Sequence, residues 1–390
     1  MQRRAAVAGV GESEFYKRGG SPHTEFQLAC IAIRRAVEDA GLTLADVDGF
    51  VSYIDARNDP VRLSAALGIP RLEFSAQTWG GGGNGLGSAV ALADMAVCAG
   101  YARHVVVFRA LAQGQFSRYG QGGFGTQGGT RRVAGTPAFT LPYGLLTAAQ
   151  INAMQTRRFM HEHGVTQDSL FEIAYVGYEC AQRNPRALRR GAPLTREAYD
   201  ASRWIVEPFH LYDCCPENDG AAAIVVTSTE RARDLRRGAV PILAAAQGLE
   251  PRGGAGAFNE APFPTAHMRH VGESLWRNAG VGPADIDVAQ FYENFTGPVL
   301  MAIAEMGLCA ADDLEGWVTS GALRWPHGTL PMNTSGGNFG EAYIHGFGLV
   351  TEAVRQIRGE STSQVDGAAL SLVVGGPGYA PGSAVLFCRD

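Results

Sequence analysis

The stretch from Pro331 to Gly348 is rich in glycine and holds the side chains with the most potential for chemistry. It carries an amide, a carboxylate, a phenol and an imidazole, on Asn333, Glu341, Tyr343 and His345. Apolar residues at helical spacing follow it, so we expect a loop that presents these groups at the start of a helix. Loops held by rigid elements are where catalytic groups usually sit. An ordinary glycine-rich turn around a packed tyrosine is the alternative.

A second polar cluster, Tyr292, Glu293 and Asn294, comes directly after an apolar run that predicts a strand over 286–291. Two more glycine-rich segments, 80–87 and 375–379, also follow predicted strands. In folds that alternate strands and helices, sites lie at the carboxyl ends of the strands. The sequence therefore places all these segments where a site is expected.

Composition describes a globular chain and excludes some partners. The 390 residues are 46% hydrophobic and 18% charged, enough for one large or two ordinary domains. The net charge of -5 gives no basic field for nucleic acid or an anionic membrane. No uncharged apolar run approaches the ~18 residues of a membrane helix, and the N-terminal apolar run is too short for a signal peptide. Seven cysteines without metal-ligand spacing predict a reduced, cytoplasmic protein with no metal site and no cofactor of its own.

Hydrophobic periodicity predicts alternating strands and helices, and hence mostly parallel sheets. A capping box at Thr24 and Gln27 begins the first helix, and Gly41 closes it. The helix expected over 88–99 is apolar nearly all round, so we expect it between two sheets. The stretch 113–135, rich in Gly and Gln, is too long for a simple connection and predicts a lid, a binding loop or disorder.

The second half of the chain repeats the first. Residues 40–48 align with 279–287, each as a helix end, a short loop and a strand start, and five of the nine positions are identical. The repeat predicts two copies of one α/β unit, over 1–230 and 231–390, with an insertion at about 111–205 in the first.

A possible dinucleotide-binding fingerprint in the chain is a weak signal. Gly80, Gly82 and Gly85 satisfy G-x-G-x-x-G between a strand and a helix. Four consecutive glycines match such a pattern easily, and the next strand ends without an acidic residue for a ribose hydroxyl.

Taken together, the motifs resemble the thiolase superfamily, in the branch of sterol-carrier-protein thiolases and lipid-transfer proteins, over nearly the whole length. Residues 287–295 resemble that branch's Glu-Leu-His-Asp-x-Phe segment, and 333–346 resemble its Asn-Pro-x-Gly-Gly and Gly-His-Pro-x-Gly segments. Residues 214–223 match a strand entry of the branch. The resemblance implies an α/β fold of two stacked βαβαβ halves in five layers, with buried central helices.

The departures from the thiolase pattern concern the catalytic groups. The resemblance places the nucleophilic cysteine at Gly83 and the second cysteine at Val373 or Val374. The two histidines fall on Tyr292 and Tyr343. Without a thiolate there is no acyl-enzyme by that route.

Two tyrosines in place of two histidines resemble the thiolase-superfamily aldolases that cleave steroid side chains. That resemblance implies retro-aldol cleavage of a bulky β-hydroxyacyl-CoA, with Tyr292 and Tyr343 as general acid and base. It also implies a small OB-fold partner protein and a homodimer at the core. Packed tyrosines with satisfied hydroxyls are the alternative.

Supporting roles fall to weaker candidates. His345 could orient Tyr343 or a water, and Asn294, Glu293 and Asn333 are possible supporting residues. The glycine loops are expected to bind substrate and its oxyanion, through Gly82, Gly83, Asn84, Gly376 and Gly378. Two other functions remain open, a non-catalytic acyl-CoA-binding subunit and a thiolase or acyltransferase with an atypical nucleophile.

Overall fold

The computed structural model describes residues 5–54, 57–79, 82–116, 118, 137–235, 238–250, 263, 265–376 and 381–389. Most of the Gly- and Gln-rich stretch at 113–135 lies outside the described residues, and so does Gly378.

The strands form one continuous sheet in the order β10-β11-β12-β9-β1-β8-β5-β3-β4, with β2 beside β8. The bounds are β1 Ala5–Glu12, β2 Tyr16–Lys17, β3 Gly49–Tyr53, β4 Phe74–Thr78, β5 His104–Ala112, β8 Asn218–Ser228, β9 Val240–Gly248, β10 Val288–Phe291, β11 Leu370–Gly375 and β12 Gly382–Cys388, while β6 Trp204–Val206 and β7 Phe209–His210 form a separate pair. Among the described strands, the two half-sheets are hydrogen-bonded to each other where β1 pairs with β9, through Ala6 with Pro241 and Val7 with Val240. The sheet is therefore two half-sheets joined at one short seam.

The expectation of mostly parallel sheets is wrong for the described strands. Only β3 with β4, β3 with β5, and β10 with β11 pair in parallel. β8 runs antiparallel to β1 and β5, because the helical insertion before it reverses the direction of the chain. β12 is antiparallel to β11 and β9, and the connection from β11 to β12 is too short for a crossover between parallel strands.

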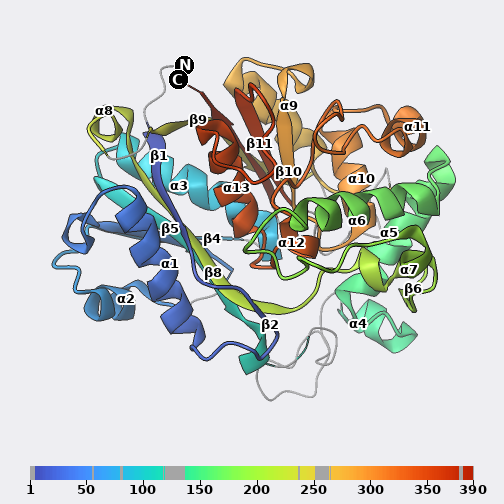
Figure 1. Ribbon diagram of the computed structural model, residues 1–390, viewed down its shortest axis with the longest axis horizontal. Coiled ribbons are helices and arrows are strands. Elements are labelled where there is room, and N and C mark those ends of the chain that lie inside the picture. The colour runs from blue at the N-terminus through green and yellow to red at the C-terminus, as the bar shows by residue number, and fades with distance from the viewer. Residues whose placement is uncertain are drawn as a thin grey trace.

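Helices and half-sheets alternate in five layers (Figure 1). Helices α1 (Glu25–Asp39) and α2 (Pro60–Leu67) cover the outer face of the first half-sheet. Between the half-sheets lie α3 (Leu86–Cys98) and α13 (Phe347–Arg358). Outside the second half-sheet pack α6 (Gln167–Ala181), α9 (Arg269–Ala279), α10 (Thr296–Glu305) and α11 (Leu314–Thr319). The five-layer arrangement predicted from the sequence is confirmed.

The remaining helices are α4 Pro137–Thr140, α5 Ala148–His163, α7 Arg196–Asp200, α8 Thr229–Ala232 and α12 Gly337–Gly340.

Local sequence patterns correctly predicted the positions of α1 and α3. Thr24 and Gln27 form the expected capping box at the start of α1, and Gly41 follows that helix with φ of +74°. α3 contacts strands of both half-sheets, as its apolar surface predicted. Its burial is incomplete at the far end, where Met95 is 52% exposed.

The internal repeat is visible in matching hydrogen bonds. The carboxylate of Asp48 accepts the backbone N–H groups of Arg103 and His104 at the start of β5. The carboxylate of Asp287 accepts those of Ala369 and Leu370 at the start of β11. Each half therefore uses the aspartate at the matching position of the repeat to bind the start of another strand of its sheet. Among the described residues, no helix has the length and apolar character needed to cross a membrane.

Candidate active site

Tyr292 and Tyr343 meet at the centre of the molecule, between the half-sheets. Their hydroxyl oxygens are 2.7 Å apart, and the residues are only 3% and 6% exposed. The backbone N–H of Tyr292 donates to Val374 O, which extends the pairing of β10 with β11. The backbone N–H of Tyr343 donates to Oδ1 of Asn218 at 2.8 Å, so the start of β8 fixes the second tyrosine. The structure thus brings together the two residues that the sequence singled out.

Glycines surround the ring of Tyr292. A Cβ on Gly83 would lie 2.3 Å from two of its ring carbons, and a Cβ on Gly346 would lie 2.6 Å from one. A Cβ on Gly82 would lie 2.9 Å from the Tyr292 hydroxyl. The ring therefore fills the space that a side chain at position 83 would need.

The third glycine segment closes the same site. A Cβ on Gly375 would lie 2.7 Å from the carbonyl oxygen of Gly83, so β11 ends against the start of α3. Ser383 of β12 donates its hydroxyl to Asn84 O and accepts the N–H of Gly87 at 3.0 Å. Gly376 lies near Met268, and the side chain of Asn84 is buried. The segments expected at strand ends do converge.

His345 lies beside Tyr343 in a conformation that L-residues rarely adopt, with φ of +47°. Its ring stands edge-on to that of Tyr343, with centroids 5.4 Å apart and planes at 82°. The hydroxyl of Tyr53 donates to the His345 carbonyl oxygen at 2.8 Å, and burial raises the pKa of Tyr53, which keeps it protonated. Nε of Arg109 donates to Nδ1 of His345 at 3.1 Å.

Asn333 and Glu293 hold the backbone behind the tyrosines. Asn333, with φ of +48°, uses its side chain to accept the N–H of Phe291 at 2.7 Å and to donate to Phe291 O at 3.0 Å. The carboxylate of Glu293 accepts the N–H of Asn338 at 2.6 Å and its side-chain amide at 2.9 Å. Asn294 accepts the N–H of Phe295 next to it. These contacts join β10 to the 333–340 segment.

Burial dominates the electrostatics of Glu293, which is 0% exposed. Removal from water raises the pKa of its carboxyl from 4.5 to about 8, although the N–H donors at Asn338 and Phe339 act in the opposite direction. Protonated Glu293 is thus the favoured form over most of the neutral range.

A separate buried carboxylate, Asp213, connects the helical insertion to the site. It accepts hydrogen bonds from the hydroxyls of Tyr199 and Thr296 and from the N–H of His210. Burial raises the pKa of Asp213 to about 6, and those donors limit the rise. Thr296 begins α10, four residues beyond Tyr292, so this cluster fixes the exit of the chain from the site.

Sequence reasoning missed Arg109, Asn218 and Tyr53. Arg109 stands alone among apolar residues in β5, and a charged residue in a fully buried strand requires a specific partner. This pattern in the sequence could have identified Arg109 as a functional candidate. Asn218 lies in the 214–223 segment that the resemblance covers, but its role and that of Tyr53 depend on contacts with residues more than 100 positions away.

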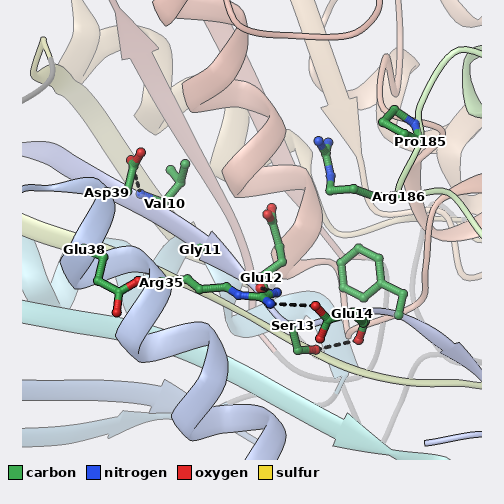
Figure 2. A pocket seen from close by; sticks show the side chains of 11 residues that line it. Val10, Gly11, Glu12, Ser13, Glu14, Arg35, Glu38, Asp39, Pro185 and Arg186 are labelled. Atoms are coloured by element: carbon green, nitrogen blue, oxygen red, sulfur yellow. Dashed lines mark hydrogen bonds and ion pairs between the residues drawn. The ribbon is translucent and has the colours of Figure 1, made fainter.

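A cavity of about 620 Å³ lies elsewhere, between β1, α1 and the loop at Pro185 and Arg186 (Figure 2). Charges of both signs line it, and Arg35 bridges to Glu14 across it at 2.6 Å. None of the site residues predicted from the sequence lines this cavity.

The tyrosine pair can move protons, whereas the nearby thiols are poor nucleophiles. A phenol donates and accepts, so two phenols in contact can pass a proton from one oxygen to the other. Burial raises the pKa of the Cys214 and Cys215 thiols, with Cys215 packed against the cluster that includes the tyrosines. Acid–base chemistry fits this geometry better than covalent catalysis.

Several known proteins are similar to this chain over most of its length. The family described as Thiolase C-terminal domain-like matches residues 255–387. A steroid side-chain-cleaving aldolase of Thermomonospora curvata is 40% identical over 99% of this chain and 98% of its own length. A 17-hydroxy-3-oxo-4-pregnene-20-carboxyl-CoA lyase of Mycobacterium tuberculosis is 38% identical over 99% of this chain and 100% of its own.

A solved structure described as an Ltp2-ChsH2(DUF35) aldolase superimposes with a TM-score of 0.91, at 38% identity over 99% of this chain and 98% of the other. The fold, the family match and the identity over the full length all indicate the same family. The chain belongs to the thiolase superfamily and, within it, to the family of steroid side-chain-cleaving aldolases, which are carbon–carbon lyases.

Proposed function

We propose that this chain catalyses retro-aldol cleavage of a 17-hydroxy steroid carrying a propionyl-CoA side chain, with Tyr292 and Tyr343 as its acid–base pair. The products are a 17-ketosteroid and propionyl-CoA. The substrate class rests on the two named relatives. The proposal depends on one observation above all, the 2.7 Å contact between two buried hydroxyls.

Proton transfer through the pair balances the reaction. The proton of the substrate hydroxyl passes to one phenol oxygen as the carbon–carbon bond breaks. The proton of that phenol crosses the short hydrogen bond to the other oxygen, and the second phenol protonates the α-carbon of the CoA enolate. Both tyrosines end the cycle neutral, so the pair needs no exchange with solvent to reset. Either tyrosine can begin the relay, because either hydroxyl can be the donor in the pair.

The glycine loops supply the surroundings for the enolate. Gly82, Gly83 and Asn84 precede the amino end of α3, whose backbone N–H groups and dipole favour negative charge. Gly376 directly follows β11, whose last residue, Gly375, packs against the carbonyl oxygen of Gly83. We assign the oxyanion and the thioester to these loops, and CoA enters as part of the substrate.

Assembly completes the proposal. A small OB-fold protein is the expected partner, and the solved structure described as an Ltp2-ChsH2(DUF35) aldolase supports a two-protein enzyme. We also propose a homodimer built on β4, which is one of the two terminal strands of the sheet among the described residues. Trp79, directly after it, is 89% exposed. Exposed strand edges next to apolar side chains favour pairing with a second copy.

The test is turnover of the 17-hydroxy steroid propionyl-CoA by the purified protein with its partner, followed by mass spectrometry of both products. Tyr292→Phe and Tyr343→Phe should each lower kcat by about 10²–10⁴-fold, the usual contribution of a general acid or base. Tyr178→Phe is the matched control, since it removes a hydroxyl from a buried tyrosine on α6 outside the site.

Full activity in the Tyr292→Phe, Tyr343→Phe double variant would disprove the catalytic pair. An acyl adduct on the intact protein would instead favour a thiolase with an atypical nucleophile. Binding of the thioester without product would favour the non-catalytic subunit.

A further inference from the structure

Arg109 makes an unusual contact with His345 beside the tyrosine pair. The side chain extends from β5 and is 1% exposed. Its Nε and Nη2 atoms lie 3.1 Å and 3.0 Å from the same atom, Nδ1 of His345. Two guanidinium nitrogens therefore converge on one imidazole nitrogen.

The contact defines the tautomer of His345. A guanidinium carries only donors and keeps its charge in proteins, so Nδ1 must accept with its lone pair. A proton on Nδ1 would direct an N–H at two N–H groups of a cation. The ring is therefore neutral, and its single proton lies on Nε2.

Three further contacts fix the position of this ring. The Tyr53 hydroxyl donates to the backbone oxygen of His345, and the Arg109 guanidinium lies 5.8 Å from the centre of the Tyr53 ring. The edge-on contact with Tyr343 holds the imidazole against one member of the tyrosine pair. The positive φ of His345 persists because these contacts hold it.

We infer that Arg109 is a positioning residue that holds His345 as a neutral Nε2–H donor beside the tyrosines. In this state His345 cannot act as a general base, because one nitrogen is protonated and the other is engaged by Arg109. It can only donate. Its role in catalysis rests on the proposed function above, where it would donate to negative charge that develops on a phenol or on the enolate. The tautomer itself does not depend on that function.

The first test is ¹⁵N NMR of the protein labelled at histidine. One of the nine imidazoles should show an unprotonated Nδ1 and a protonated Nε2 from about pH 5 to about pH 9, and His345→Gln should remove its signals. In Arg109→Met no guanidinium holds Nδ1 of His345 as an acceptor, so the same ring should titrate near neutral pH. A His345 that titrates in the wild-type protein, or that carries its proton on Nδ1, would overturn the inference whatever the activity of the enzyme.

The second test is kinetic. Arg109→Met should lower kcat by about 10- to 100-fold with little change in KM, the usual cost of removing a supporting partner, and add a new ionisation to the pH profile. Arg109→Lys keeps a cationic donor and should restore part of the loss. His345→Gln keeps an N–H donor and should retain more activity than His345→Leu.

Arg358→Met is the matched control, because it removes a buried arginine side chain, 4% exposed, that pairs with Asp39 away from the site. If Arg109→Met fails to fold, Arg109→Lys and the wild-type NMR spectrum still decide the tautomer. Equal activity in His345→Gln and His345→Leu would disprove the donor role.

Discussion

Position 83 has room only for glycine, because a neighbouring side chain occupies the space that a Cβ would need. Its backbone φ is not in the left-handed region, so an alanine could adopt the conformation, but the Tyr292 ring leaves no room for a methyl group. The carbons that block it, Cδ2, Cε2 and Cγ, lie along one edge of the ring at 2.3 to 2.8 Å. The requirement therefore comes from one neighbour, and removing that neighbour should remove it.

Gly83→Ala should destabilise the protein by about 1–3 kcal/mol and lower activity sharply, because the added methyl overpacks the site and displaces Tyr292. In a Tyr292→Ala background the same substitution should cost far less, since the ring is gone. Urea unfolding of the four proteins measures this coupling. Gly238→Ala, where a Cβ has open space, is the control. Additive effects of the two substitutions would contradict the proposed clash.

Among the elements, β10 and the 333–340 segment act as one unit. Asn333 pairs with the backbone of Phe291 on both its N–H and its C=O, and Glu293 accepts the N–H groups of Asn338 and Phe339 in α12. Each link crosses about 40 residues of sequence. Tyr292 and Tyr343 are therefore positioned by a common frame rather than by two independent loops.

The raised pKa of Glu293 predicts how stability varies with pH. The folded protein holds this proton up to about pH 8, whereas the unfolded chain releases it near 4.5. The associated stability is complete below the lower value and is lost as pH rises through the upper one. Glu293→Gln should flatten the fall in the free energy of unfolding between these two pH values.

Chemical denaturation across that pH range, for the wild type and the variant, measures the difference. Glu273→Gln, on the exposed face of α9, provides a matched change of charge. A wild type and a Glu293→Gln variant with parallel pH profiles would show that the carboxyl is ionised in the folded protein.

Local patterns predicted most elements because they depend on neighbours in sequence. The capping box of α1, the buried α3 and the repeated helix–turn–strand units were all visible in residue types and spacing. The direction of β8 was not, because it depends on how the insertion returns to the sheet. The positions of Tyr292 and Tyr343 came from the resemblance, and their contact with each other is a property of the fold.

On the scale of the whole molecule, buried ion pairs supplement the short seam between β1 and β9. Arg355 of α13 pairs with Glu12 of β1, and Arg358 of the same helix pairs with Asp39 of α1 at 2.7 Å. Burial raises the pKa of Glu12, but the charge and hydrogen bonds of Arg355 outweigh it and lower the pKa from 4.5 to about 2. These pairs connect the last helix of the chain to its first strand and first helix.

Arg355→Met should cost about 3–5 kcal/mol, because it leaves a buried carboxylate without its main partner. The double variant Glu12→Leu, Arg355→Met should have a free energy of unfolding closer to that of the wild type, since it leaves no buried charge without a partner. Because the pKa of Glu12 is lowered, its stabilisation is complete above about pH 4.5 and is lost as pH falls toward 2, so the double variant should also lose less stability in acid. Acid and urea unfolding measure both effects. A double variant less stable than Arg355→Met would contradict the argument.

The ring of Tyr292 over Gly83 also has an evolutionary consequence. If position 83 once carried a cysteine, as the resemblance implies, a single reversion to cysteine would place its Cβ 2.3 Å from two carbons of the present ring. Tyr292 would have to be replaced by a smaller residue first, and under the proposed function that step would remove one member of the proton pair. If the proposed function holds, a return to acyl transfer would pass through a protein without either set of catalytic groups. The contact between Tyr292 and Gly83 would therefore hinder reversion to acyl transfer in a lineage that has acquired it, and favour the retention of lyase chemistry.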